Sequence, residues 1–298
     1  MLDWKRAKSE ASRESRPTMH LGDIEVHYLD GGNFWLDGGA MFGVVPKVFW
    51  QKKSPPDDKN RIRMRANSLL VRAHGKNIII ETGNGAKWDL KQRAIYGVEE
   101  GDPLMDSLSR AGLTPNQIDL VINTHLHFDH SGGNTRIVEN HPRPAFPNAR
   151  YVVQRNELAH AMNPTERDRA SYFPENFVPI SKEGLWDLLD GDSEILPGIS
   201  VTRIPGHNAD IQAVTITGGG KTIAFVADLF PTRHHIPLPW IMAYDLYPLQ
   251  TLETKRLWIP RILAGGWVVI FGHDPDIAAA TFHERDGKIE IGPVDLNR

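Results

Sequence analysis

Short apolar runs recur along the chain, with the length and branched composition of buried strands. In the first half they cover residues 24–28, 68–73, 77–81, 120–123 and 151–154, and in the second half 200–204, 212–217, 222–227 and 267–271. Runs of four to eight such residues between Gly, Pro or polar positions are typical of strands. A helix is expected over 104–111, ending at Gly112, and another from Leu249, which Pro260 should interrupt. Two halves that each hold strands and helices predict an α/β protein built as a four-layer αβ/βα sandwich.

A dense group of metal-ligand residue types directly follows one predicted strand. The segment Thr124-His125-Leu126-His127-Phe128-Asp129-His130 holds three imidazoles and a carboxylate in six consecutive positions, and Gly132-Gly133 after it permits a sharp turn. Two His at i and i+2 can turn toward one point, while Asp129 and His130 can face a second point. One loop can therefore serve two metal ions.

Further ligand types follow three later strands. His207 comes after the run 200–204, Asp228 directly after 222–227, and His273 after 267–271. A rigid sheet that presents a site from its loop-bearing edge would give this repeated pattern. Zinc takes four ligands, and a catalytic zinc keeps one position for water, so these residues can complete the coordination.

The order of these blocks resembles that of the metallo-β-lactamase-fold hydrolases, from about Asn67 to His273. The resemblance implies the four-layer sandwich and two Zn²⁺, with Fe, Co or Mn as alternatives. It implies a first metal on His125, His127 and His207, a second on Asp129, His130 and His273, and Asp228 as a bridge. Asp129 and Asp228 are the expected catalytic carboxylates, and a hydroxide bridging the two metals is the expected nucleophile.

Glu81 departs from the family pattern, which usually carries Asp at this place to support a metal-bound His. A Glu is one methylene longer and can still orient a ligand imidazole. A plain carboxylate at a strand end fits this position equally well. Glu81 is therefore left outside the expected ligand set.

Composition limits the alternatives. The chain has 298 residues, 40% hydrophobic and 24% charged, with net charge −3 and no Cys. We expect one domain over residues 1–298, with an N-terminal extension at about 1–20 and a loop insertion at about 41–66. The absence of a Lys/Arg-rich block argues against nucleic-acid binding, and the absence of an apolar leader or span favours a cytoplasmic protein with no membrane partner. Thiolate catalysis is excluded.

Two aromatic, Pro-punctuated segments, residues 41–50 and 230–245, are expected to form loops near the metals. They contribute the candidate substrate residues Phe49, Trp50, His234, Trp240 and Tyr244. Aromatic loops also form protein interfaces, so a homodimer contact explains the same composition.

Within the superfamily these segments look most like the N-acyl homoserine lactonases, which quench quorum sensing, and their methyl parathion hydrolase relatives. That resemblance implies hydrolysis of a small-molecule lactone or related ester. Many such lactonases carry a Tyr three positions beyond the bridging Asp, where this chain has Pro231. Phosphotriester hydrolysis, a glyoxalase II-like thioesterase and a β-lactamase remain alternatives on the same site, as do an iron dioxygenase and a binding domain without catalysis.

Overall fold

The computed structural model describes residues 18–296, and two seven-stranded sheets dominate it. The first sheet, in the order β1-β2-β3-β4-β5-β8-β9, comprises β1 (Met19–Leu21), β2 (Ile24–Asp37), β3 (Arg61–Ala73), β4 (Lys76–Ile80), β5 (Leu120–Ile122), β8 (Arg150–Gln154) and β9 (Trp186–Leu189). The second, in the order β10 to β16, comprises β10 (Ser193–Leu196), β11 (Ile199–Arg203), β12 (Gln212–Gly218), β13 (Lys221–Phe225), β14 (Val268–Ile270), β15 (Ala279–Arg285) and β16 (Lys288–Val294). A separate hairpin pairs β6 (Thr135–Val138) with β7 (His141–Pro144).

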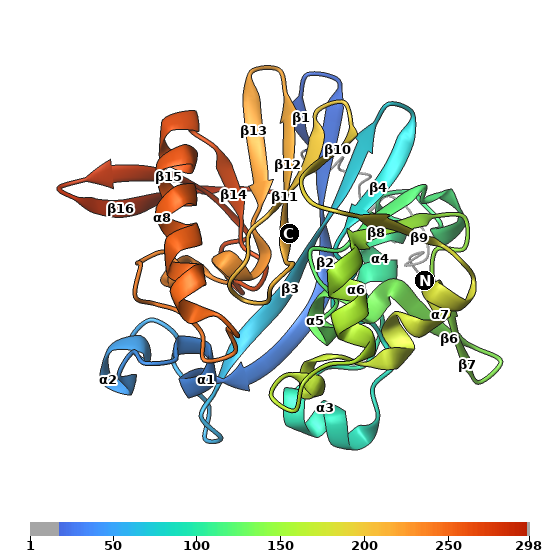
Figure 1. The fold of residues 1–298 in the computed structure, drawn as a ribbon, viewed down its shortest axis with the longest axis horizontal. Coiled ribbons are helices and arrows are strands. Elements are labelled where there is room, and N and C mark those ends of the chain that lie inside the picture. Colours follow the sequence, from blue (N-terminus) through green and yellow to red (C-terminus); the bar gives the residue numbers. More distant parts are fainter. Residues whose placement is uncertain (1–17, 297–298) are drawn as a thin grey trace, which may run out of the picture.

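Eight α-helices in the described part of the chain surround the two sheets, and some of them cover the outer sheet faces (Figure 1). They are α1 (Gly38–Phe42), α2 (Lys47–Trp50), α3 (Leu90–Tyr96), α4 (Pro103–Arg110), α5 (Phe128–Ser131), α6 (Arg155–Met162), α7 (Val178–Lys182) and α8 (Pro248–Gly265). The helix α8 lies beside the second sheet, and α4, α6 and α7 lie beside the first (Figure 1). The expected α/β architecture is therefore confirmed, with two mixed sheets between layers of helices (Figure 1).

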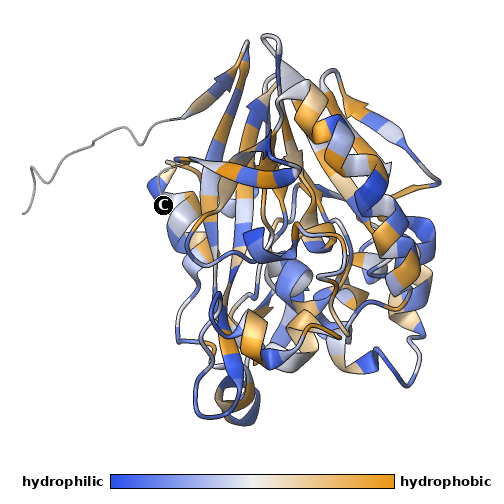
Figure 2. Cartoon of the chain, turned by 90° about the vertical axis from the view of Figure 1, so that its left-hand side faces the viewer, coloured by the Kyte–Doolittle hydropathy of each residue, from blue (hydrophilic) through white to orange (hydrophobic). Residues whose placement is uncertain are grey.

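The main core lies between the sheets and draws on both. Val71 and Ile80 of the first sheet belong to the same buried cluster as Ile216 and Phe225 of the second. Figure 2 shows hydrophobic and hydrophilic residues alternating along many of the strands, as a sheet with one buried face requires. Because burial of apolar surface fixes the register of each strand, it also fixes where each strand ends and its loop begins.

The structure extends or corrects several boundaries. The strands β2 and β3 are much longer than their apolar runs and pair as far as Asp37 and Arg61. The connection between them, residues 38–60, contains α1 and α2, and residues 61–66 of the expected insertion lie in β3. The expected extension falls outside the described residues up to position 17, and Met19–Leu21 form β1.

The prediction that Pro260 interrupts the last helix is wrong, because α8 continues through it. A proline removes the hydrogen bond to the carbonyl four residues earlier, which here belongs to Arg256. Both residues are exposed, so water can satisfy that carbonyl.

Among the described residues, no helix is long and apolar enough to cross a membrane.

Candidate metal centre

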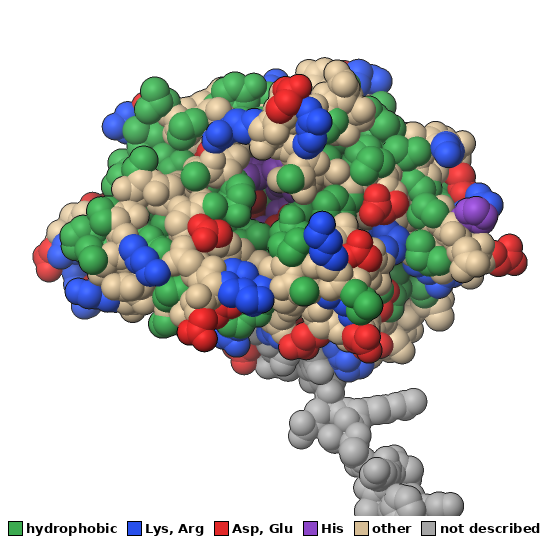
Figure 3. All heavy atoms as spheres, turned by 90° about the horizontal axis from the view of Figure 1, so that it is seen from below, with side chains coloured by type: hydrophobic (Ala, Val, Ile, Leu, Met, Phe, Trp, Pro, Cys, Tyr) green, Lys and Arg blue, Asp and Glu red, His purple; other side chains and the backbone are tan. Residues whose placement is uncertain are grey.

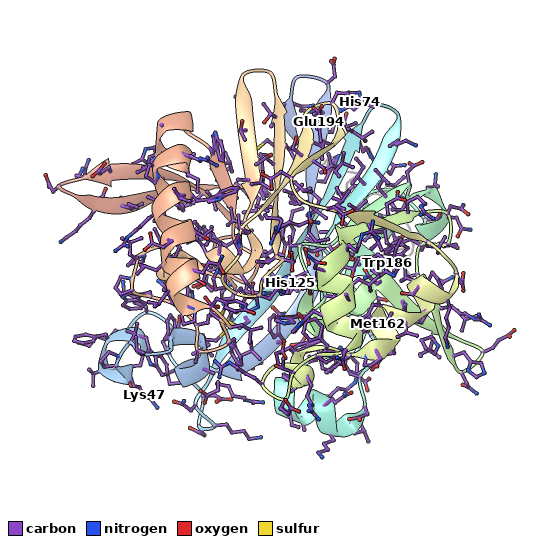
Figure 4. The ribbon with its side chains drawn as sticks, viewed as in Figure 1. Lys47, His74, His125, Met162, Trp186 and Glu194 are labelled. Atoms are coloured by element: carbon purple, nitrogen blue, oxygen red, sulfur yellow. The ribbon has the colours of Figure 1, made fainter. Side chains whose placement is uncertain are left out.

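Every expected ligand follows the end of a strand at the edge where the two sheets meet. His125 and His127 come after β5, His207 after β11, Asp228 after β13 and His273 after β14. Backbone hydrogen bonds join two of these loops to strands of the opposite sheet: Gln212 N of β12 donates to Thr124 O, and Arg65 N of β3 donates to His273 O. Figure 4 places His125 in the middle of the molecule. The strand ends thus bring residues from four loops to one place.

Three imidazoles form a first group, defined as His125, His127 and His207. The Nδ1 atom of His127 lies 3.1 Å from His125 Nε2 and 3.1 Å from His207 Nε2. All three side chains are buried. Two zinc-bound nitrogens in a tetrahedral site lie about 3.3 Å apart, so the spacing matches that of ligands around one ion.

A second group, defined as Asp129, His130 and His273, lies beside the first. His130 Nε2 is 2.9 Å from His273 Nε2, and Asp129 Oδ2 is 3.5 Å from the same His273 atom. These three residues are also buried, and their candidate ligand atoms all lie within 4.8 Å of one another. The group offers two nitrogens and an oxygen to one ion.

Asp228 lies between the two groups. Its Oδ2 is 3.2 Å from His207 Nε2 in the first group, while its Oδ1 is 3.0 Å from His273 Nε2 and 3.4 Å from His130 Nε2 in the second. Each oxygen therefore faces a different group. The preceding residue, Ala227, has φ of 44°, a strained conformation for a residue with a side chain. This backbone turn directs Asp228 back over the end of its strand.

The electrostatics of the centre are those of a cation site. Burial and the neighbouring imidazoles hold the pKa of His125 and of His127 well below the ordinary value, so both rings are neutral ligands. Burial raises the pKa of Asp228, but the imidazoles of His273, His130 and His207 outweigh it and hold that pKa well below its usual range. His127 Nδ1 faces both His125 Nε2 and His207 Nε2 at 3.1 Å, and one ring proton cannot satisfy both contacts, whereas a cation can. This donor set of imidazoles and carboxylates suits zinc.

Outer hydrogen bonds hold four of the five imidazoles. His125 Nδ1 lies 3.0 Å from Thr124 Oγ1, and His207 Nδ1 lies 3.0 Å from Asp245 Oδ1. In the second group, His130 Nδ1 lies 3.0 Å from Glu81 Oε2, and His273 Nδ1 lies 3.2 Å from Arg65 O. Such partners fix the orientation of a ligand imidazole.

Glu81 thus supports a ligand from outside the coordination sphere. One carboxylate oxygen accepts from Thr124 N and the other faces His130 Nδ1, so its extra methylene does not prevent contact with the ligand loop. Its φ of 62° is strained.

Gly132 is required for a reason other than the expected turn. Its φ is −56°, which any residue can adopt, but a Cβ there would lie 2.1 Å from Asn84 O.

A set of rings lies against the second group and is called the aromatic cluster: Phe34, Trp88, Tyr96, Phe128 and Phe173. Phe128 is central, stacked on Phe173 at 5.2 Å and tilted against Tyr96 at 4.8 Å. Phe34 meets His273 edge-on at 5.3 Å. Seen from below, histidine side chains lie at the bottom of a hollow rimmed largely by apolar side chains (Figure 3).

The structure separates the expected substrate residues. Trp50 is 1% exposed and stacks on Phe42, so its ring is covered by protein. The expected contact between Trp50 and the substrate is therefore corrected. Phe49 and Trp240 line a surface hollow of about 660 Å³, whereas His234 lines another of about 210 Å³. None of the seven metal-ligand candidates lines either hollow. Tyr244 is 36% exposed.

Burial and the negative charge of Asp129 in the second group affect the pKa of two phenols, Tyr96 and Tyr244. Burial raises the pKa of each phenol, and the carboxylate of Asp129 adds to both shifts. Both side chains therefore remain protonated hydrogen-bond donors. Tyr96, Asp245 and Glu157 were not predicted from the sequence. Asp245 ends the aromatic segment 230–245 but carries no signal of its own there, and Tyr96 and Glu157 come from segments without a recognisable local pattern.

Comparisons with known proteins agree with this geometry. The family model described as the metallo-beta-lactamase superfamily matches residues 61–273. The crystal structure of a probable metal-dependent hydrolase from Staphylococcus aureus is 34% identical, covers 93% of this chain and 99% of that one, and superposes with a TM-score of 0.86.

Two further relatives are lactonases. An N-acyl homoserine lactonase of Bacillus thuringiensis is 32% identical over 178 residues, which are 59% of this chain but only 63% of the relative. The dizinc quorum-quenching lactonase AidC, solved with the product N-hexanoyl-L-homoserine, is 20% identical and superposes with a TM-score of 0.78 over 94% of this chain and 97% of that one. At that identity the likeness is one of fold.

Proposed function

The chain belongs to the metallo-beta-lactamase superfamily, and from this premise we propose that it is a dinuclear zinc hydrolase that opens a lactone of the N-acyl homoserine lactone class or a related ester. The observation that carries the proposal is the placement of Asp228 between two buried ligand groups, under an apolar rim. The lactonases among the relatives support the substrate class.

The two groups would each hold one zinc ion, and Asp228 would contribute one oxygen to each. When bound, the metals supply Lewis acidity at the substrate carbonyl and lower the pKa of a water toward 7. The neutral rings of His125 and His127 bind without first releasing a proton.

Asp228 and Asp129 carry the remaining chemistry of the site. The low pKa of Asp228 keeps its carboxylate ionised, as a metal ligand must be. With the metals bound, Asp228 could take the proton of the attacking water and deliver it to the leaving alkoxide. Asp129 orients the second group through its contacts with His130 and His273. Pro231 cannot donate a hydrogen bond to the substrate carbonyl, whereas the phenols of Tyr96 and Tyr244 stay protonated and are the candidate donors in its place.

The aromatic cluster favours a substrate with an apolar part. Phe34 and Phe128 are buried. The half-buried rings of the cluster, Trp88, Tyr96 and Phe173, are therefore the ones against which an acyl or alkyl group can pack. Burial of such a group stabilises the complex by about 0.8 kcal/mol per methylene. A charged, extended substrate finds no matching cationic surface in this cluster.

Turnover of a lactone and of an organophosphate triester by the same zinc-loaded protein tests the proposal. We expect the lactone to be preferred, and His125→Ala or Asp228→Ala to lower kcat/KM by at least about 10³-fold, since loss of a ligand disrupts the centre. His74→Ala is the matched control: this exposed histidine contacts Pro197 O and lies far from His125 in Figure 4. Full activity of Asp228→Ala, or exclusive turnover of the triester, would contradict the proposal.

A further inference from the structure

The carboxylate of Glu157 lies between two loops that carry ligands of the first group. Glu157 is on α6 and is 1% exposed. Its Oε1 accepts from Leu126 N at 2.8 Å, the amide between His125 and His127. Its Oε2 accepts from Asn208 Nδ2 at 2.9 Å, and Asn208 follows His207 directly. One side chain therefore connects the two loops that must converge on one ion.

His127 is the ligand that most needs such support. Of the five imidazoles in the centre, it is the one whose outer nitrogen, Nε2, is buried without a hydrogen-bond partner among the described residues. Thr124, Asp245, Glu81 and the carbonyl of Arg65 serve the other four. The orientation of the His127 ring must therefore be set by its backbone and by packing.

Both the backbone beside His127 and the ring that packs on it contact Glu157. The ring of Tyr172 packs edge-on against His127 at 4.6 Å, and its hydroxyl donates to Glu157 Oε1 at 3.1 Å. The backbone of the same loop is held through Leu126 N. Asn208 is itself fixed, since its Oδ1 accepts from Asp210 N at 3.0 Å. Two of the three donors to Glu157, Tyr172 and Asn208, are thus directed by other contacts.

We propose that Glu157 is a positioning residue for the first metal, holding the His127 and His207 loops at the separation that one ion requires. The proposal rests on the dinuclear centre proposed above. A buried carboxylate is costly without partners, and three donors on one carboxylate compensate for that cost only in this arrangement of the loops. Glu157 therefore acts on the metal through His127 and His207 without contacting it.

Zinc titration of the metal-free full chain, followed by calorimetry, tests this role. Glu157→Gln keeps the side-chain shape but places an amide N–H₂ against the Asn208 donor. We expect one of two binding steps to weaken by about 10- to 100-fold, as is usual on loss of an outer partner, and the other to change by less than about twofold. The weakened step should be the one that His127→Ala abolishes, and the unchanged step the one that His273→Ala abolishes.

Two further variants make the result decisive. Asp168→Asn is the matched control, since this buried carboxylate contacts His160 and Thr165 but neither ligand loop, and both of its binding steps should match wild type. Tyr172→Phe keeps the ring against His127 and removes only the hydroxyl, so a smaller loss in the same step is expected. This variant keeps the test open if Glu157→Gln folds poorly.

The outcomes separate this inference from the proposed function. Unchanged binding steps in both Glu157→Gln and Tyr172→Phe, or equal weakening of both steps, would overturn the role of Glu157. A wild-type chain that binds no zinc would instead overturn the dinuclear centre itself.

Discussion

Asp228 is the residue through which the two ligand groups meet, because its oxygens lie 3.2 Å from His207 and 3.0 Å from His273. Around it, a second set of side chains determines which way each imidazole points. Thr124 directly precedes the ligand His125, and Glu81 accepts a hydrogen bond from Thr124 N. Asp245 and Glu157 come from separate segments of the chain. The geometry of the centre therefore depends on contacts beyond the seven ligand candidates.

Glu81→Gln tests one of these contacts. The amide can offer its oxygen to Thr124 N or to His130, but not to both, so zinc affinity at the second group should fall by about 10- to 100-fold. Zinc titration of the metal-free protein gives the affinity. Glu194→Gln, whose exposed carboxylate accepts from Gly198 N far from the centre in Figure 4, should bind as wild type. Equal affinities in the two variants would show that Glu81 has no such role.

At this scale the sequence predicted the candidate ligands because their spacing is local and chemically specific. It could not decide the role of Glu81, which depends on the distance from β4 to His130 across the sheet. It also could not find Glu157, since an acidic residue in a short helix has no distinguishing pattern. Trp50 was misjudged because aromatic composition does not separate a buried ring from a ring that lines a pocket.

The loop after Asp228 illustrates how one helix can hold an element without regular structure. Lys255 of α8 is fully buried, and its Nζ donates to the carbonyls of His235, Pro237 and Trp240 at 2.6, 2.8 and 3.0 Å. His235 is fixed in turn, with Nδ1 2.8 Å from Thr232 Oγ1 and Nε2 2.8 Å from Met41 O. This explains why the segment leaves the metal centre in one defined path.

Lys255→Met should lower the free energy of unfolding by about 3 kcal/mol, because the buried carbonyls lose their donor. Burial lowers the pKa of Lys255 to about 7, opposed by the charge of Asp245. Between pH 7 and 10 the unfolded chain then binds up to one more proton than the folded chain. The free energy of unfolding of the wild type should therefore rise relative to that of Lys255→Met as the pH increases, by at most about 1.4 kcal/mol per pH unit. Urea unfolding at pH 7, 8 and 9 gives the difference.

A flat difference over that range would contradict the lowered pKa. Arg256→Met is the matched control: this exposed neighbour pairs with Glu253 and should change stability by less than about 1 kcal/mol at each pH.

The positions of many strands and of the helices α4 and α8 were predictable from the apolar runs of the sequence. The lengths of β2 and β3 and the continuity of α8 were not, because they depend on long-range pairing and on which face meets water.

In the whole molecule, the metal centre joins the two sheets at one end. Asn67 of β3 donates from Nδ2 to Phe271 O at 2.7 Å and to Asp274 O at 3.1 Å, so the first sheet holds the loop of His273. Gln212 of β12 likewise donates from Nε2 to Asn123 O at 2.9 Å. Metal binding should therefore stabilise the contact between both halves of the fold.

Chelation should lower the melting temperature of the metal-loaded protein by several degrees. A ligand that binds only the folded state stabilises it by RT ln(1 + [L]/Kd), which is about 4 kcal/mol at a thousandfold excess over Kd. Differential scanning calorimetry with and without a chelator measures the shift, and His125→Ala should show a smaller one. Identical melting temperatures with and without metal would contradict a shared metal centre between the sheets.

The architecture was the most predictable feature, because alternating strands and helices with ligands after strand ends restrict the folds that bring those ligands together. Substrate choice was the least predictable, since it depends on loop geometry. The aromatic cluster that we propose as a substrate contact could not be predicted, because its rings come from β2, α3, α5 and segments near residues 88 and 173.

The most direct test of the central claim is proton release from a long-chain N-acyl homoserine lactone at neutral pH, by protein whose metal content has been measured. We expect two zinc ions per chain, rapid acid release, loss of the activity on chelation and its return when zinc is restored. A sample that holds two zinc ions and releases no acid would contradict the lactonase proposal. Phosphotriesters and thioesters would then be the next substrates to test on the same centre.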